Sequence, residues 1–332
     1  MGLVVFGVLA LVGSMAVVFG ALLLLVAQGQ VDPSPEGLLE WQDTLLQIDA
    51  SDPMVLALSL GSIAIWLPAV AGGLWAAGLR PLAHVSSVAL RLRWRWMLRS
   101  AVVALATLAL SFALSFGLGA LTGETGSPVW TPWQQLLLPM ILILLLVPFQ
   151  AAAEEYVFRG LLVQALGSWL PRRVWSRIIV VIVPTLAFVF SHGYGVWGQL
   201  DVGVFALAAM WVTLRTGGLE AAIALHVINN VVVFTMLASG ALGSTVNGAE
   251  GGSLAGVLIT AITSIGFCWV VDVLARRGGI ERTSSWPERE AAAPLPIALP
   301  HPGIGWLGPA PTPQAALAGA LPGGPGDETK SR

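Results

Sequence analysis

The feature that most constrains this chain is a series of long apolar stretches without a single charged residue. A helix needs about 20 apolar residues to cross a hydrocarbon layer roughly 30 Å thick. Only 10% of the residues are charged, against roughly 25% in a typical soluble protein. We therefore predict an all-α protein, a polytopic bundle of about eight transmembrane spans. The predicted spans lie at residues 3–27, 54–79, 100–121, 134–153, 178–192, 202–214, 221–237 and 253–271.

Basic residues fall on alternate connections between these spans. Connection 28–53 has six acidic residues and no Lys or Arg, whereas residues 80–99 contain five arginines. Basic residues return at 172–177, at Arg215 and at 276–277. Because cytoplasmic connections carry the excess of Lys and Arg, we predict a multi-pass membrane protein with both termini cytoplasmic. The Ala- and Gly-rich composition, with Arg preferred over Lys, favours the plasma membrane of a bacterium.

Composition also divides the chain and excludes several classes of protein. We expect N-terminal helices and loops at 1–133, a helical core at 134–278 and a disordered Pro/Gly/Ala-rich cytoplasmic tail at 279–332. A net charge of −2 gives no basic footprint for nucleic acid. One cysteine, Cys268, excludes an intramolecular disulfide framework. The Arg- and Trp-rich run at 91–99 is typical of an anchor at the lipid headgroups.

Ionisable residues inside a membrane are costly, so each one is a functional candidate. Glu154, Glu155 and Arg159 follow one apolar run. On a helix Glu155 and Arg159 are four residues apart and face each other, which leaves Glu154 available as a general base. The alternative for this group alone is a structural ion pair at the membrane boundary.

Two further polar groups end or interrupt apolar runs. His192 closes the fifth predicted span, and His226 and Asn230 lie one helical turn apart within the seventh. Each group alone could be structural, since buried His and Asn also join helices by hydrogen bonds. Together, a carboxylate, two imidazoles and a carboxamide can deprotonate a water and stabilise an oxyanion, as amide hydrolysis requires.

The three groups form the ordered motifs EExxxR (Glu154 to Arg159), FxxxH (Phe188 to His192) and HxxxN (His226 to Asn230). In this respect the chain resembles the CAAX protease and bacteriocin-processing family of intramembrane peptidases, related to CAAX prenyl protease type II and lysostaphin resistance protein A. The resemblance implies an all-helical intramembrane protease with a conical, cytoplasm-facing active-site cavity. It also implies that residues 134–278 are the catalytic core.

Carried to these positions, the family mechanism makes Glu154 the base, assisted by His192. His226 and Asn230 form the oxyanion hole, and Glu155 and Arg159 support the helix. A zinc mechanism with Glu154, His192 and His226 as ligands stays open, since one Glu and two His form a plausible catalytic zinc set. We favour the metal-independent route, because Asn230 beside His226 suits an oxyanion donor.

Two functions remain after this comparison. The first is an intramembrane endopeptidase that acts on membrane-presented peptides or protein termini, with membrane lipid and the peptide or protein substrate as partners. The second is a non-proteolytic membrane adaptor or immunity-type protein that binds a partner through the same polar cluster. The complete set of catalytic residue types favours the first. The sequence indicates neither a substrate nor an oligomeric state.

Overall fold

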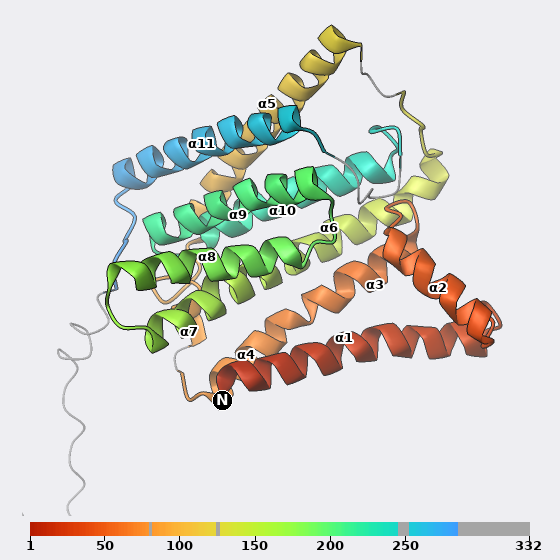
Figure 1. Cartoon of the computed structure of the whole chain (residues 1–332), viewed down its shortest axis with the longest axis horizontal. Coiled ribbons are helices and arrows are strands. Elements are labelled where there is room, and N and C mark those ends of the chain that lie inside the picture. The colour runs from red at the N-terminus through yellow and green to blue at the C-terminus, as the bar shows by residue number, and fades with distance from the viewer. Residues whose placement is uncertain (80–81, 124–126, 245–251, 285–332) are drawn as a thin grey trace, which may run out of the picture. The chain divides into compact units, whose positions relative to one another are not determined.

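The computed structural model describes residues 1–79, 82–123, 127–244 and 252–284 (Figure 1). Within these ranges the secondary structure is helical and contains no named strand, so the predicted all-α fold is confirmed. Residues Met1–Ser285 form one compact unit. Most of the predicted tail, from residue 285 on, lies outside the described residues.

The N-terminal part contains two predicted spans and a helix that the sequence analysis did not anticipate. Its elements are α1 (Gly2–Ala27), α2 (Pro35–Gln47), α3 (Pro53–Ala64), α4 (Trp66–Ala76) and the 3-10 turn η1 (Leu82–Val85). Helix α2 lies within the acidic connection. Ser34 caps it by accepting a hydrogen bond from Gly37 N at 3.2 Å, and Pro35 occupies the first turn, where a missing N–H costs little.

The second predicted span is divided between α3 and α4. Pro68 has no N–H to donate to the carbonyl of Ala64, where α3 ends. Residues 53–76 nevertheless form one apolar stretch long enough to cross a membrane. Proline thus accounts for the break without removing the span.

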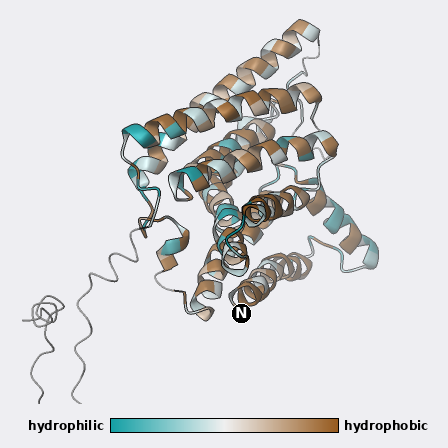
Figure 2. Ribbon diagram, turned by 60° about the vertical axis from the view of Figure 1, so that its left-hand side comes forward, coloured by the Kyte–Doolittle hydropathy of each residue, from teal (hydrophilic) through white to brown (hydrophobic). Residues whose placement is uncertain are grey.

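The remaining helices follow the other six predicted spans. They are α5 (Trp94–Thr122), α6 (Trp133–Glu155), the π-helical turn η2 (Tyr156–Leu161), α7 (Leu162–Trp169), α8 (Val174–Phe190), α9 (Val196–Thr216), α10 (Glu220–Ala238) and α11 (Leu254–Arg277). Seven helical segments of the described chain are long and apolar enough to span a membrane. Figure 2 shows the apolar character of these helices against the more polar α2. Helix α8 has 17 residues, or about 25 Å.

A buried contact between distant residues bears on whether α8 also crosses. Arg93, just before α5, pairs with Glu220, the first residue of α10. The starts of these two helices therefore lie on one side of the bundle, which requires an even number of crossings between them. Helices α5, α6, α8 and α9 supply four. The contact is consistent with eight spans, with α8 as the short one.

Helix α10 packs against α5, α6 and α9 (Figure 1). Its first seven residues, 220–226, are all buried. Three of them, Ala221, Ala222 and Ala224, are small and let neighbouring helices approach closely. This packing places the polar residues of α10 inside the bundle, next to those of α6.

Candidate active site

A buried ion pair joins the end of α6 to the π-helical turn. Arg159 Nη1 donates to Glu155 Oε1 at 3.0 Å, and both side chains are almost fully buried. The Arg159 guanidinium also lies 4.1 Å from the centre of the Phe188 ring, and its Nη2 donates to the carbonyl of Ala206 on α9. The pair therefore ties α6 to α8 and α9. π-Helical turns such as η2 occur frequently at functional sites.

His226 lies between the two glutamates. Its Nδ1 is 2.8 Å from Glu155 Oε1, and its Nε2 is 3.5 Å from Glu154 Oε2. Because an ionised carboxylate only accepts hydrogen bonds, Nδ1 is the donor. In neutral His226 the Nε2 lone pair then faces Glu154. An imidazole oriented by a carboxylate in this way has a fixed tautomer.

Glu154 is held by a residue that the sequence analysis missed. Gln150 Nε2 donates to Glu154 Oε1 at 2.8 Å, and Asn230 Nδ2 donates to Gln150 Oε1 at 3.2 Å. Asn229 in turn donates to Asn230 Oδ1. Gln150 is buried and lies four residues before Glu154, so its position on the same helical face was the available signal.

The result is a continuous polar chain across α10 and α6, from Asn229 to Arg159. Three of its atoms are buried without a hydrogen-bond partner, namely Glu154 Oε2, Glu155 Oε2 and Arg159 Nε. Buried polar groups of this kind are rare and call for an explanation, of which a catalytic role is one. Of the predicted site residues, this chain of polar contacts brings together Glu154, Glu155, Arg159, His226 and Asn230.

His192 lies at the edge of this chain. It follows the C-terminal end of α8 and is half-buried, and its Nδ1 donates to the carbonyl of Phe188 at 2.7 Å. The Phe188 ring lies between the two histidines, with ring centres 4.6 Å from His192 and 5.7 Å from His226. Among the described residues no hydrogen bond or ion pair joins His192 to Glu154.

The proposed zinc ligands can be tested against this arrangement. A catalytic zinc ion takes three protein ligands and a water. Within the described part of the chain, no group of three or more His, Cys, Asp and Glu side chains is placed to hold a metal. Glu154 and His226 are neighbours, but His192 is held apart at Phe188. As placed, Glu154, His192 and His226 do not fit a zinc site.

An apolar cavity lies beside the polar chain. Its volume is about 670 Å³, and its walls come from α4, η1, α5, α6, η2 and α10. Ala152 of α6 and Tyr156 of η2 line it, as do Ile223 and Val227 of α10. None of the predicted site residues does. This hollow adjoins the polar chain and does not enclose it, because Glu154 faces away from Ala152 around α6. An active-site cavity that encloses the predicted site residues stays a prediction.

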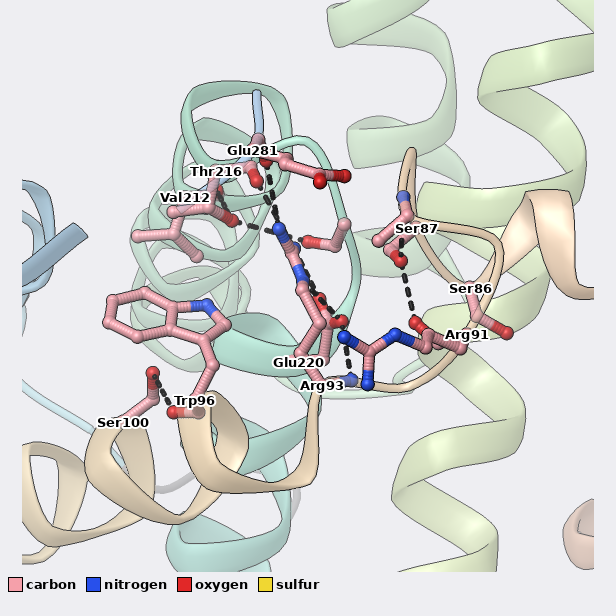
Figure 3. A network of polar contacts seen from close by, with 12 residues as sticks. Ser86, Ser87, Arg91, Arg93, Trp96, Ser100, Val212, Thr216, Glu220 and Glu281 are labelled. Carbon is pink, nitrogen blue, oxygen red and sulfur yellow. Dashed lines mark hydrogen bonds and ion pairs between the residues drawn. The ribbon is translucent and has the colours of Figure 1, made fainter. Parts of the chain in front are cut away.

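A second buried ion pair was also missed from the sequence. Arg93 donates through Nε and Nη2 to both carboxylate oxygens of Glu220 at 2.7 Å, and further to the carbonyls of Thr216 and Glu281 (Figure 3). The sequence analysis placed Arg93 in a run that anchors at the lipid headgroups, whereas Arg93 is 9% exposed and Glu220 is fully buried. This pair fixes the starts of α5 and α10 to the end of α9.

The fold and the buried groups define a class of protein, a multi-pass helical membrane protein with an ionisable cluster inside its bundle. Residues 132–232, which contain every predicted site residue, match the family described as type II CAAX prenyl endopeptidase Rce1-like. The resemblance stated from the motifs is thereby confirmed over this segment. The match supports an intramembrane endopeptidase of the CAAX-protease type in general.

A curated relative extends this comparison without adding an activity. The uncharacterized protein YyaK of Bacillus subtilis (strain 168) is 33% identical over 92 residues, which amount to 26% of this chain and 30% of the relative. The chain thus matches less than a third of that protein's length. No solved structure matches the chain significantly.

Proposed function

We propose that this chain is an intramembrane endopeptidase that hydrolyses peptide bonds of membrane-presented peptides or protein termini. The observation that carries the proposal is the difference between the two oxygens of the Glu154 carboxylate, one hydrogen-bonded and one not. Gln150 holds its Oε1, while its Oε2 is buried, has no hydrogen-bond partner and lies 3.5 Å from His226 Nε2. A fixed carboxylate with one free oxygen in an apolar bundle is suited to accept a proton from water.

The proposed first step is attack by that water. Glu154 Oε2 takes one proton as the water oxygen bonds to the substrate carbonyl carbon, and the carbonyl oxygen becomes an oxyanion. Glu154 then gives the proton to the departing amine as the C–N bond breaks. His192 assists by orienting the water through Nε2, since Nδ1 is committed to the Phe188 carbonyl. Its half-buried position gives it access that Glu155 lacks.

The proposed oxyanion donors are Asn230 and His226. Asn230 uses one amide hydrogen on Gln150 and retains a second for the oxyanion. His226 Nε2 donates only when the imidazole carries both protons.

The apolar cavity is the proposed place for the apolar part of the substrate. It shares α6 and α10 with the polar chain and is lined almost entirely by hydrophobic side chains. Such a hollow favours chains that already reside in the bilayer. We propose the plasma membrane of a bacterium as the location, with the arginine-bearing helix ends and both termini in the cytoplasm.

The decisive test compares wild type with Glu154→Ala in proteoliposomes that present a pool of membrane-anchored peptides. We expect cleavage to fall by about 10²–10⁴-fold, the usual contribution of a general base. The matched control is Glu40→Ala on α2, an exposed glutamate outside the bundle core, which should cleave like wild type. Equal product patterns for wild type and Glu154→Ala would contradict the protease proposal and favour the adaptor alternative.

The zinc alternative is tested separately by exhaustive chelation of the wild type. The metal-independent route predicts full retained activity. Loss of activity that zinc restores would instead require His192 to leave Phe188 and join Glu154 and His226.

A further inference from the structure

A second cleft lies at the arginine-bearing end of the bundle, between α5 and α11. Its volume is about 490 Å³, and it is lined by Arg99, Val102, Val103, Leu274, Arg277 and Gly278. Helix α11 packs against α5 (Figure 1). The cleft shares no residue with the polar chain at Glu154, so the proposed catalysis does not account for its two arginines.

The two arginines of the cleft have no carboxylate partner in the described part of the chain, unlike the three arginines that surround Asp272. Asp272 pairs with Arg215, Arg276 and Arg282. Arg93 pairs with Glu220, and Arg159 with Glu155. In the described ranges no acidic side chain forms an ion pair with Arg99 or Arg277, and both are exposed.

The arrangement of charge and apolar surface is the same on both helices. Val102 and Val103 follow Arg99 by three and four residues, so they lie one turn further along α5. Leu274 precedes Arg277 by three residues on the antiparallel α11. In both cases the guanidinium is nearer the helix end and the apolar side chain lies one turn deeper. The Arg99 guanidinium also reaches Gly278, whose added Cβ would lie 3.8 Å from its Nη1.

The length of α5 puts Arg99 at the depth of the lipid headgroups. Its 29 residues span about 43 Å, which exceeds the hydrocarbon thickness of roughly 30 Å. Its first turn carries the exposed Trp94 and Arg95 before Arg99, residue types that favour the interface. Basic pockets between transmembrane helices on the cytoplasmic side are a known form of anionic lipid site.

We propose that this cleft binds one anionic phospholipid. Arg99 and Arg277 hold the headgroup phosphate, which guanidinium groups bind well through paired hydrogen bonds. An acyl chain lies along Val102, Val103 and Leu274. The bound lipid bridges α5 and α11 at two arginines that form no ion pair with any described acidic side chain.

The test uses purified full-length protein in a neutral detergent, titrated with phosphatidylglycerol or with phosphatidylcholine of the same chain length. Lipid binding is followed by native mass spectrometry and by the shift in Tm. Wild type should prefer phosphatidylglycerol. The double variant Arg99→Gln with Arg277→Gln should bind phosphatidylglycerol about 30-fold more weakly, because each arginine near the membrane surface contributes about 5-fold to the affinity. Binding of phosphatidylcholine should not change.

The matched control is Arg172→Gln with Arg173→Gln, which removes the same charge from the turn before α8. It should retain the phosphatidylglycerol preference within about 3-fold. An equal loss in this control would show diffuse charge attraction and overturn the site. A wild type that binds both lipids alike would overturn it too.

Two further arms separate the lipid from its headgroup and binding from folding. Inorganic phosphate should neither raise the Tm nor displace phosphatidylglycerol at equal concentration; if it did both, the site would be one for free phosphate and not for lipid. Val102→Phe keeps both arginines and fills the cleft from a 69% exposed position. It should weaken phosphatidylglycerol binding with an unchanged lipid-free Tm, and unchanged binding would contradict the acyl-chain contact.

Discussion

Replacing Arg159 by Met should destabilise the protein more than replacing the whole ion pair. Arg159 and Glu155 are 1% and 0% exposed, so Arg159→Met leaves the Glu155 carboxylate buried without its cation. Breaking a buried pair from one side costs about 3–5 kcal/mol. The lost contact with the Phe188 ring adds about 1–2 kcal/mol.

The double variant Glu155→Gln with Arg159→Met removes both charges and keeps similar volumes. The carboxamide oxygen that Glu155→Gln introduces can still accept the hydrogen bond from His226 Nδ1, which in wild type lies 2.8 Å from Glu155 Oε1. We therefore expect the double variant to lie within about 2 kcal/mol of wild type. The difference between the sum of the two single changes and the double change is the coupling free energy, which we expect to exceed about 3 kcal/mol.

The assay is reversible unfolding of the purified protein in mixed micelles with increasing denaturing detergent, followed by tryptophan fluorescence. The midpoint and slope give the free energy of unfolding of the four proteins in the cycle. Additive single changes, or an Arg159→Met variant within about 1 kcal/mol of wild type, would refute the argument, because either result means that the carboxylate is solvated or that another cation compensates it.

Two further variants test positions that the sequence alone did not reveal. Gln150→Leu removes the hydrogen bonds to Glu154 and Asn230. The kcat for peptide cleavage should therefore fall about 10- to 100-fold, equivalent to roughly 1.4–2.7 kcal/mol of activation free energy, with KM little changed. A kcat within about 2-fold of wild type would contradict a positioning role for Gln150. Gly218→Ala places a Cβ 2.3 Å from Glu220 Oε2 and 2.5 Å from Arg93 Nη2, and should lower the free energy of unfolding by about 1–3 kcal/mol. Gly7→Ala on α1, whose Cβ would meet nothing within 4 Å, is its control and should be neutral or slightly stabilising.

The helices were predictable from the sequence because each span is a local property of composition. An uncharged apolar run of sufficient length has few alternatives to a membrane helix. The details that escaped prediction depend on local backbone chemistry. Pro68 splits one span into α3 and α4, and the π-helical turn at Tyr156–Leu161 changes the helical register where the apolar pattern gives no sign of it.

The site was predictable only in part, since spacing along one helix is visible in a sequence and packing between helices is not. The pairing of Glu155 with Arg159 follows from their separation of four residues. The partners of Arg93 lie 123–188 residues away, and no local pattern distinguishes it from the neighbouring arginines of its loop. The position of His192 beside Phe188 depends likewise on how α8 packs within the bundle.

Helix α10 connects the ion pair of Arg93 and Glu220 with the proposed catalytic residues. Its first residue, Glu220, is neutralised by Arg93 at the start of α5, and its seventh, His226, is held from α6. Moving α10 along its axis would therefore break a buried ion pair at one contact and separate His226 from both glutamates at the other. Each break exposes a costly unpaired charge or polar group. The Arg93 pair, although remote from Glu154 in sequence, thus fixes the distance between His226 Nε2 and Glu154 Oε2 on which the proposed chemistry depends.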